Sequence, residues 1–208
     1  MSTARLLQLA FEPDAGASDD LTGERILDAA LALAAASGLR HLTMDDVAAR
    51  AGVGRMTVYR RFGTRQLLLD TLVVREGRRC LEAIATSFDP GDPLDLRAAD
   101  VFVATLKVIR DHPLLARLAR IEPEALLHEL TRNDSEVFAL VRAFLVAQIR
   151  QALDSHELVA GDPDTLAELT LRLAASFVLI PDSALDLADE ERVRERVREL
   201  LGPLVAAA

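Results

Sequence analysis

The sequence is poor in cysteine, tyrosine and tryptophan and has no long apolar run. Among its 208 residues there is one cysteine, Cys80, one tyrosine and no tryptophan. One cysteine cannot form an internal disulfide, which fits a reducing cytosol, and we therefore expect a cytoplasmic protein. No apolar run approaches the about 20 residues of a membrane span, and the segment Leu6–Phe11 is too short and too weakly basic for a signal peptide. These absences predict a chain with no membrane partner.

The motifs that catalysis and cofactor binding need are missing as well. There is no glycine-rich phosphate loop, no G-x-S-x-G turn and no paired-cysteine or paired-histidine metal motif. His112, His128 and His156 lie 16 and 28 residues apart, which is not a metal-ligand spacing. We expect no catalytic residues, no metal and no cofactor, and therefore no enzyme.

The net charge of −9 argues against nucleic-acid binding until it is divided along the chain. Residues 22–79 carry ten arginines and six acidic residues, a net charge of +4, whereas residues 80–208 carry a net charge of −10 and residues 1–21 of −3. Phosphate binding responds to charges within about 8–10 Å rather than to the total. The charge division therefore allows a DNA-binding segment in 22–79 and supports a separate acidic domain after it.

The patterning predicts an all-α fold, because no segment alternates polar and apolar residues for long enough to form a strand. We expect a mobile N-terminal arm at 1–21, a three-helix domain at 22–80 and a larger helical domain at 81–208. Helices are expected at 22–37, 55–62, from 64 toward 80 or 84, and at 94–111, 113–120, 123–130, 135–155, 163–180 and 189–205.

The stretch Leu42–Leu69 has the pattern of a helix-turn-helix. Thr43 is a helix N-cap, and Asp46 three residues later completes a capping box. Gly52 supplies the positive φ of a tight turn, and the next helix is expected from Arg55 to Phe62. That helix has the size and charge to enter a DNA major groove.

The spacing around the turn makes this pattern specific. A small residue, Ala48, lets the two helix backbones approach each other, and four apolar positions hold the helices at a steep angle: Val47, Ala51, Val53 and Val58. A helical hairpin with no role in nucleic-acid binding is the alternative.

Residues 22–72 closely resemble the DNA-binding domain of TetR-family transcriptional regulators. The similarity lies in TGERILDAALALAAASG and LTMDDVAARAGVGRMTVYRRFGTRQLLL. It implies a homodimer, a double-stranded DNA operator and a small-molecule effector held in the C-terminal domain. Two positions depart from the family pattern: Gly54 stands where a serine is usual, and Ala34 lies near the place of a usual phenylalanine.

The resemblance also implies roles for individual residues. Arg55, Met56 and Thr57 match positions that point into the major groove, and Arg60, next to Tyr59, could serve either a base or a phosphate. Thr43, Tyr59, Thr64 and Arg65 match positions that meet the sugar-phosphate backbone, and Arg25 is a weaker phosphate candidate. Thr43 and Thr64 would be favoured as helix caps without DNA.

The C-terminal half yields candidate residues for a dimer interface and a ligand pocket. The interface candidates form apolar stripes on the last two helices: Leu166, Leu169, Leu173, Phe177, Val193, Val197, Leu200, Leu201 and Leu204. A monomer could also bury both stripes internally. The candidate pocket-lining residues are Phe102, Thr105, Leu106, Ile109, His112, Phe138, Arg142, Phe144, Gln148 and Phe177. Their mostly apolar character favours a hydrophobic or amphipathic ligand.

These observations predict a ligand-responsive DNA-binding regulator, a repressor that binds a palindromic operator as a homodimer. The alternative from another class is a helical adaptor that docks a protein through its helix-turn-helix, and an enzyme is a third reading.

Overall fold

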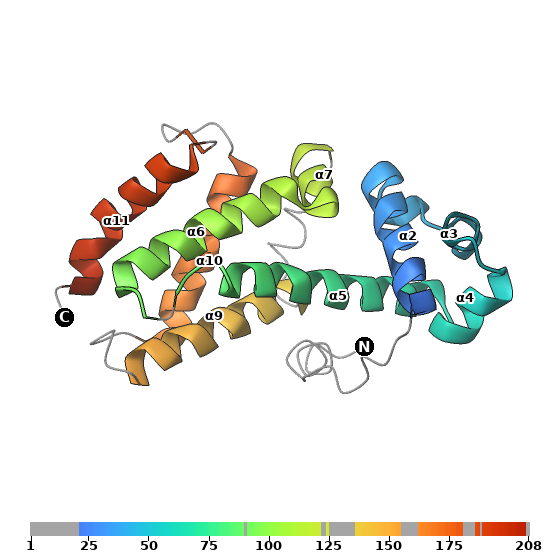
Figure 1. Ribbon diagram of the computed structural model, residues 1–208, viewed down its shortest axis with the longest axis horizontal. Coiled ribbons are helices and arrows are strands. Elements are labelled where there is room, and N and C mark those ends of the chain that lie inside the picture. Colours follow the sequence, from blue (N-terminus) through green and yellow to red (C-terminus); the bar gives the residue numbers. More distant parts are fainter. Residues whose placement is uncertain are drawn as a thin grey trace. The chain divides into compact units, whose positions relative to one another are not determined.

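The computed structural model describes residues 21–89, 91–121, 124, 136–154, 162–180, 186–187 and 189–206. All regular structure within these ranges is helical, which confirms the all-α prediction (Figure 1). The predicted arm at 1–21, apart from its last residue, and the predicted helix at 123–130, apart from residue 124, lie outside the described residues.

The helices begin and end close to the predicted positions, because most are bounded by caps and prolines that the sequence displays. They are α2 (Leu21–Ser37), α3 (Met44–Ala51), α4 (Arg55–Phe62), α5 (Arg65–Ala85), α6 (Leu94–Asp111), α7 (Pro113–Ile121), α9 (Glu136–Asp154), α10 (Pro163–Leu179) and α11 (Glu190–Ala206). A short 3-10 helix, η1 (Leu39–His41), was not predicted, since three residues show no periodicity.

The chain forms two compact units. The first contains the chain up to Arg79 together with His112–Ile121, and the second contains Cys80–Asp111 and the chain from Glu122 onward. Helix α7 thus belongs to the first unit, although residues 112–121 were expected in the second domain. The reason is that α7 carries contacts of its own to α2 and α5.

The core of the first unit is built from α2, α3, α4 and α5. Its fully buried side chains include Ile26 on α2, Val47 on α3, Val58 on α4 and Leu68 on α5. Ala34, which stands near a usual phenylalanine, is also fully buried. The positions that the spacing assigned to the helix-turn-helix core are therefore buried or packed against this core.

Helix α7 packs on α2 through one face. Leu114 is buried in the core of the first unit, and Leu118 packs against it. Between them, the Nη1 atom of Arg117 donates a hydrogen bond to the carbonyl oxygen of Ala36 at 3.0 Å. This bond satisfies a carbonyl at the C-terminal end of α2, where helix carbonyls lack intrahelical partners.

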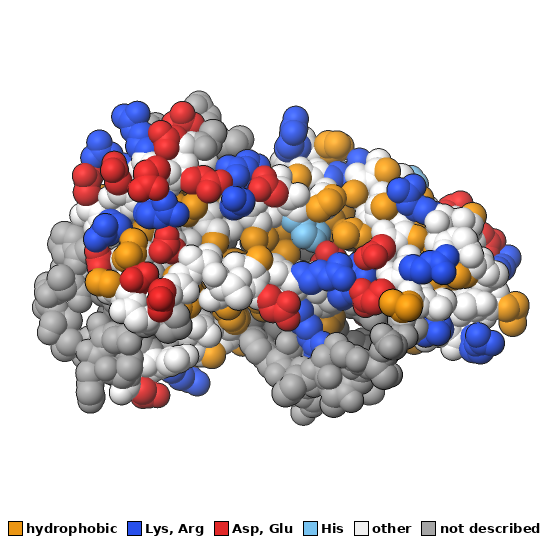
Figure 2. All heavy atoms as spheres, viewed as in Figure 1, with side chains coloured by type: hydrophobic (Ala, Val, Ile, Leu, Met, Phe, Trp, Pro, Cys, Tyr) orange, Lys and Arg blue, Asp and Glu red, His pale blue; other side chains and the backbone are white. Residues whose placement is uncertain are grey.

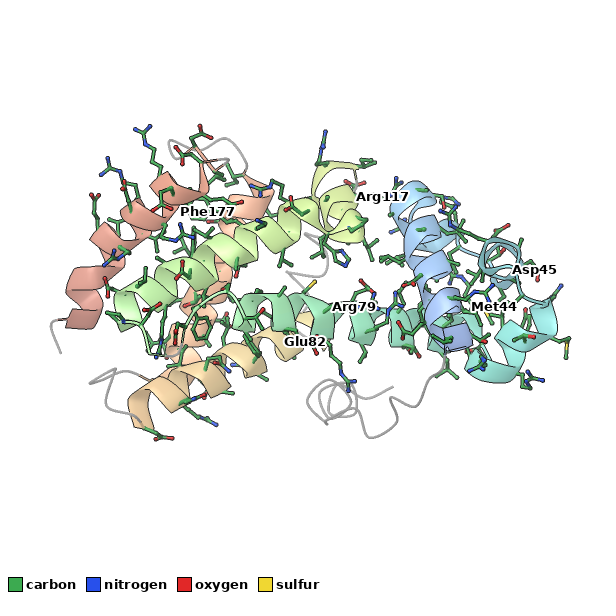
Figure 3. The ribbon with its side chains drawn as sticks, viewed as in Figure 1. Met44, Asp45, Arg79, Glu82, Arg117 and Phe177 are labelled. Carbon is green, nitrogen blue, oxygen red and sulfur yellow. The ribbon has the colours of Figure 1, made fainter. Side chains whose placement is uncertain are left out.

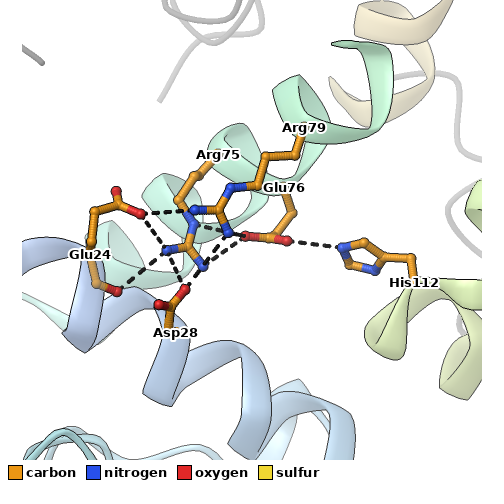
Figure 4. A network of polar contacts seen from close by, with 6 residues as sticks. All are labelled: Glu24, Asp28, Arg75, Glu76, Arg79 and His112. Carbon is orange, nitrogen blue, oxygen red and sulfur yellow. Dashed lines mark hydrogen bonds and ion pairs between the residues drawn. The ribbon is translucent and has the colours of Figure 1, made fainter. Parts of the chain in front are cut away.

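A buried carboxylate joins α5 to its neighbours (Figure 4). Glu76 is 6% exposed, and its Oε1 lies 2.7 Å from Nη2 of Arg75 and 3.3 Å from Nη1 of Arg79. Arg75 also bonds Glu24 at 3.0 Å and Asp28 at 2.9 Å, both on α2. The network therefore ties α5 to α2 with alternating charges.

His112 extends this network to α7. Its Nδ1 accepts the backbone N–H of Leu115 at 3.4 Å, so this nitrogen carries no hydrogen. The other ring nitrogen, Nε2, then bears the hydrogen and donates it to Oε2 of Glu76 at 3.0 Å. One imidazole thus caps α7 and anchors that helix to α5.

In the second unit, α11 packs along α6, and α10 packs against α9 and α6 (Figure 1). The contact between α6 and α11 has a small apolar core of Ala99, Val103, Val193 and Val197. Ion pairs flank it, among them Arg194 with Asp100 at 2.7 Å. Figure 2 shows acidic and basic side chains interspersed over this face of the second unit.

Glu76→Ala is expected to destabilise the first unit, because it leaves the guanidinium of Arg75 buried without its closest counter-charge. Removing one partner of a buried ion pair costs roughly 3–5 kcal/mol. Glu82→Ala, an exposed substitution on the same helix, is the control and should change stability by less than about 0.5 kcal/mol. Chemical denaturation with hydrogen exchange on α7 measures both, and equal effects of the two variants would refute this role for Glu76.

Candidate nucleic-acid interface

The first helix of the helix-turn-helix begins as its sequence predicts. Thr43 has an extended backbone, and its Oγ1 accepts the backbone N–H of Asp46 at 3.1 Å. The hydroxyl in turn donates to the carboxylate of Asp46 at 2.6 Å. Both side chains are therefore engaged in capping α3 without DNA.

The turn between α3 and α4 is held from two sides. Gly52 has φ 64° and ψ 38°, the left-handed conformation that disfavours residues with a Cβ. Arg25 on α2 donates from Nη2 to the carbonyl oxygen of Ala51 at 2.7 Å, next to this glycine. Arg25, a weaker phosphate candidate in the sequence, thus fixes the end of α3 onto α2.

Helix α4 presents one side to the core and the other to solvent. Val58 is fully buried, and Phe62 packs against the core. On the outer side Met56 is 77% exposed, Arg55 and Arg60 are exposed, and Thr57 and Tyr59 are half-buried. Gly54 caps the helix with its backbone alone, as expected for a residue without a hydroxyl.

The guanidinium of Arg55 is held between two side chains. Its Nη1 donates to Oδ2 of Asp45 on α3 at 3.0 Å, and its Nη2 donates to the hydroxyl of Tyr59 at 3.4 Å. The guanidinium carbon lies 5.3 Å from the centre of the Tyr59 ring, a cation–π distance. The bond to Tyr59, followed by the charge of Asp45, raises the pKa of Arg55 above its ordinary value.

Thr64 and Arg65 stand at the start of α5, directly after α4. Oγ1 of Thr64 accepts the backbone N–H of Leu67 at 3.2 Å, a helix cap. The guanidinium of Arg65 donates to the carbonyl oxygens of Leu42 and Leu39, each at 2.6 Å, and to that of Arg40 at 3.2 Å. Arg65 therefore holds the loop that leads into α3, a role that the sequence pattern did not reveal.

The helix-turn-helix as a whole is basic. Residues 43–65 contain five arginines and two aspartates, and Figure 2 shows basic side chains on the visible face of the first unit. A compact helix with an exposed basic face, set at a fixed angle on a second helix, is the arrangement that reads a DNA major groove.

Comparison with known proteins decides the family. Residues 26–72 match the family described as "Bacterial regulatory proteins, tetR family". An uncharacterised HTH-type transcriptional regulator of Mycobacterium tuberculosis (strain H37Rv) is 30% identical over 196 residues, covering 91% of this chain and 88% of the relative. The chain belongs to the TetR family.

Solved structures of TetR-like regulators share the fold. The fatty acid degradation regulator FadR of Bacillus halodurans aligns with a TM-score of 0.65 at 19% identity, over 88% of this chain and 96% of that one. The TetR-family repressor AlkX of Dietzia, implicated in biodegradation of n-alkanes, aligns with a TM-score of 0.59 at 21% identity, over 89% and 96%.

Membership in the family establishes the class of function. This TetR-family chain is a ligand-responsive, DNA-binding transcriptional regulator and not an enzyme, and regulators of its family bind DNA operators and small-molecule effectors as dimers. Within the described residues, no group of histidine, cysteine and acidic side chains is placed to hold a metal ion. No described helix is long and apolar enough to cross a membrane.

Some of the predicted pocket residues of this TetR-family regulator do come together. Phe102 on α6 and Phe177 on α10 meet edge to face, with ring centres 5.4 Å apart (Phe177 is labelled in Figure 3). Phe102 and Leu106 also pack against the α6–α11 core. Thr105 bonds its own helix at the carbonyl of Val101, 2.7 Å away.

The other pocket candidates are more scattered. Ile109 and Phe144 are half-buried, and Gln148 is exposed. Arg142 lies 3.6 Å from Asp164. The side chain of Phe138 lies outside the described residues. The assignment of His112 to a pocket in the second domain is corrected, because His112 belongs to the first unit, where it hydrogen-bonds Glu76.

The predicted interface stripes are exposed in part on α10, whereas on α11 two of the three candidates with described side chains are buried. Leu169 is 59% exposed and Leu173 51%, whereas Leu166 and Phe177 are half-buried. On α11, Val193 and Val197 are 2% and 6% exposed because they pack against α6, which corrects their assignment to a dimer interface. Leu200 is 68% exposed, and the side chains of Leu201 and Leu204 lie outside the described residues.

Arg65→Ala is expected to lower the stability of the first unit as well as DNA affinity, because three carbonyl oxygens lose a charged donor. Hydrogen bonds to charged groups contribute about 1.5–3 kcal/mol, so the thermal midpoint should fall clearly. Arg50→Ala, which removes the same charge from the exposed surface of α3, is the control and should leave the midpoint nearly unchanged. A loss of DNA affinity with no change in the midpoint would show that Arg65 acts on phosphate alone.

Proposed function

We propose that α4 is the reading helix of this regulator and that its exposed side chains contact base edges. The observation that carries the proposal is the outward face of α4, where Arg55, Met56 and Arg60 are exposed while Val58 is buried. Arginine pairs with the O6 and N7 atoms of guanine, and an apolar side chain such as Met56 can meet the methyl group of thymine. Thr57, half-buried, is the remaining base-contact candidate.

The residues that flank α4 position the helix-turn-helix on the sugar-phosphate backbone of DNA. Thr43 and Thr64 stand at the N-termini of α3 and α5, where helix N–H groups and the positive end of the dipole attract phosphate. Tyr59 adds a phenol, and Arg65 adds positive charge while it fixes the loop before α3. These contacts supply affinity, whereas α4 supplies specificity.

We infer further that the regulator is a homodimer on a palindromic operator. One reading helix covers few base pairs, whereas a two-fold dimer reads two half-sites about 34–36 Å apart, or a multiple of that distance. Leu169 and Leu173 lie one helical turn apart on α10 and leave an apolar stripe exposed in the single chain. Burial of such a stripe by a second copy would stabilise the dimer.

We infer that the protein acts as a repressor in the cytoplasm. We infer also that an apolar or amphipathic effector relieves the repression. The Phe102–Phe177 pair and Leu106 give the second unit the apolar surface that such a ligand needs. The Dietzia repressor, implicated in biodegradation of n-alkanes, and the Bacillus halodurans regulator of fatty acid degradation agree with this class of ligand. A coupling of about 1–3 kcal/mol between effector and operator corresponds to a 5- to 150-fold change in affinity.

The chain path offers a route for that coupling. Helix α6 belongs to the second unit and continues through Asp111 and His112 into α7, which belongs to the first. His112 and Arg117 fix α7 to α5 and α2. A conformational change at the end of α6 would therefore act on the two helices against which α3 and α4 pack.

Arg60→Ala is expected to relax discrimination at one base pair of the site, at a cost of about 1–3 kcal/mol, as for an arginine that reads a guanine. If Arg60 instead meets a phosphate, binding to every duplex should weaken and the slope of log K against log salt should fall by about 1. Arg196→Ala, which removes an exposed arginine from α11, is the matched control. Fluorescence anisotropy on duplexes enriched by the protein from a random pool makes the measurement, and salt-insensitive or absent binding by the unchanged protein would overturn the proposed function.

Leu169→Glu is expected to convert the dimer to a monomer of 22.6 kDa, because it places a charge in an apolar interface. Thr170→Glu, at the neighbouring exposed position, should remain dimeric. Sedimentation velocity distinguishes the two, and a monomeric mass for the unchanged protein would contradict the dimer.

A further inference from the structure

We propose that Asp45 is a specificity-determining residue that positions Arg55 for base recognition. The inference rests on the proposed function of α4. Asp45 belongs to α3, ten positions before Arg55 in the chain, and its carboxylate reaches α4 through this arginine. It acts on DNA through the arginine and not by a contact of its own.

The geometry holds the guanidinium from both ends. Oδ2 of Asp45 accepts from Nη1 at 3.0 Å, and Oδ1 lies 2.9 Å from Nε. On the other side, Nη2 reaches the hydroxyl of Tyr59 at 3.4 Å, and the Tyr59 ring lies beneath the guanidinium carbon at 5.3 Å. A long, exposed side chain that would otherwise sample many rotamers is fixed before DNA arrives.

The fixed guanidinium retains the hydrogens that a guanine needs. Each of the two Nη atoms carries two hydrogens, and the carboxylate and the phenol take one from each. A second N–H therefore remains on Nη1 and on Nη2, and arginine uses such N–H groups to bind O6 and N7 of guanine. The contacts to Asp45 and Tyr59 can thus persist while Arg55 binds the base.

The ion pair with Arg55 adds little to the stability that Asp45 already gives as an acidic residue in the first turn of α3. The two side chains of the pair are 62% and 57% exposed, and an ion pair this exposed contributes little to folding. A carboxylate beside the reading helix also repels phosphate, which weakens binding to any DNA sequence. Both effects favour specificity: the charge lowers non-specific affinity, and the orientation of Arg55 rewards the correct base.

The experiment compares Asp45→Asn with the unchanged full-length protein on two duplexes. One is the sequence that the protein enriches from a random pool, and the other differs at the base pair whose discrimination Arg55→Ala abolishes. Asp45→Asn should lower the ratio of the two affinities about two- to tenfold, the cost of ordering one long side chain on binding. It should also raise affinity for unrelated DNA, while the thermal midpoint changes little.

Two further measurements separate positioning from general charge. Asp70→Asn removes the same charge from α5, away from Arg55, and should leave the affinity ratio unchanged. In the Arg55→Ala background, Asp45→Asn should have no further effect on the ratio, because the residue through which it acts is gone. Asp45→Ser also removes the charge but has a smaller side chain than Asp45→Asn. It should lower the affinity ratio in the same way, so the result does not depend on how the asparagine packs.

The proposal is overturned if Asp45→Asn leaves the affinity ratio unchanged or raises it, or if its effect is the same with and without Arg55. It is overturned as well if Arg55→Ala alters discrimination at no base pair. Absence of DNA binding by the unchanged protein would instead refute the proposed function itself, so the two failures are distinguishable.

Discussion

The buried carboxylate of Glu76 is the constraint on which the arrangement of the first unit depends. An unpaired carboxylate in this position would be strongly unfavourable, and the chain surrounds it with Arg75, Arg79 and His112 (Figure 4). Through these partners one side chain of α5 fixes α2 on one side and α7 on the other. The helix-turn-helix is built on α2 and α5, so its orientation depends on the same network.

Arginine has two distinct roles in the first unit. Arg25, Arg65 and Arg75 direct their guanidinium groups at carbonyl oxygens or carboxylates of the same unit, and all three are at least partly buried or engaged in long-range bonds. Arg55 and Arg60 are exposed on α4, and Arg55 stays exposed while it pairs with Asp45. The net positive charge of the segment therefore overstates the charge available to DNA, and the placement of each guanidinium decides its function.

The helix-turn-helix could be predicted almost completely from the sequence, because its determinants are local. The Thr43 cap, the Gly52 turn and the burial of Val58 each follow from residues within one or two turns of helix. The rest depends on pairs far apart in the chain. The Glu76–His112 and Arg117–Ala36 hydrogen bonds join residues 36 and 81 positions apart in the chain. Because periodicity within a helix does not reveal such contacts, the sequence did not show that α7 belongs to the first unit. An apolar stripe such as that of Val193 is equally ambiguous, since periodicity does not say which partner covers it.

We propose that two copies of α4, held in a dimer, read one DNA site. Selection from a random pool of duplexes, followed by hydroxyl-radical footprinting of the enriched sequence, tests this proposal. The expected result is an inverted repeat whose two half-sites lie about 34–36 Å apart, or a multiple of that distance, with both protected at the same protein concentration. A single half-site without symmetry, or no enriched sequence at all, would contradict it.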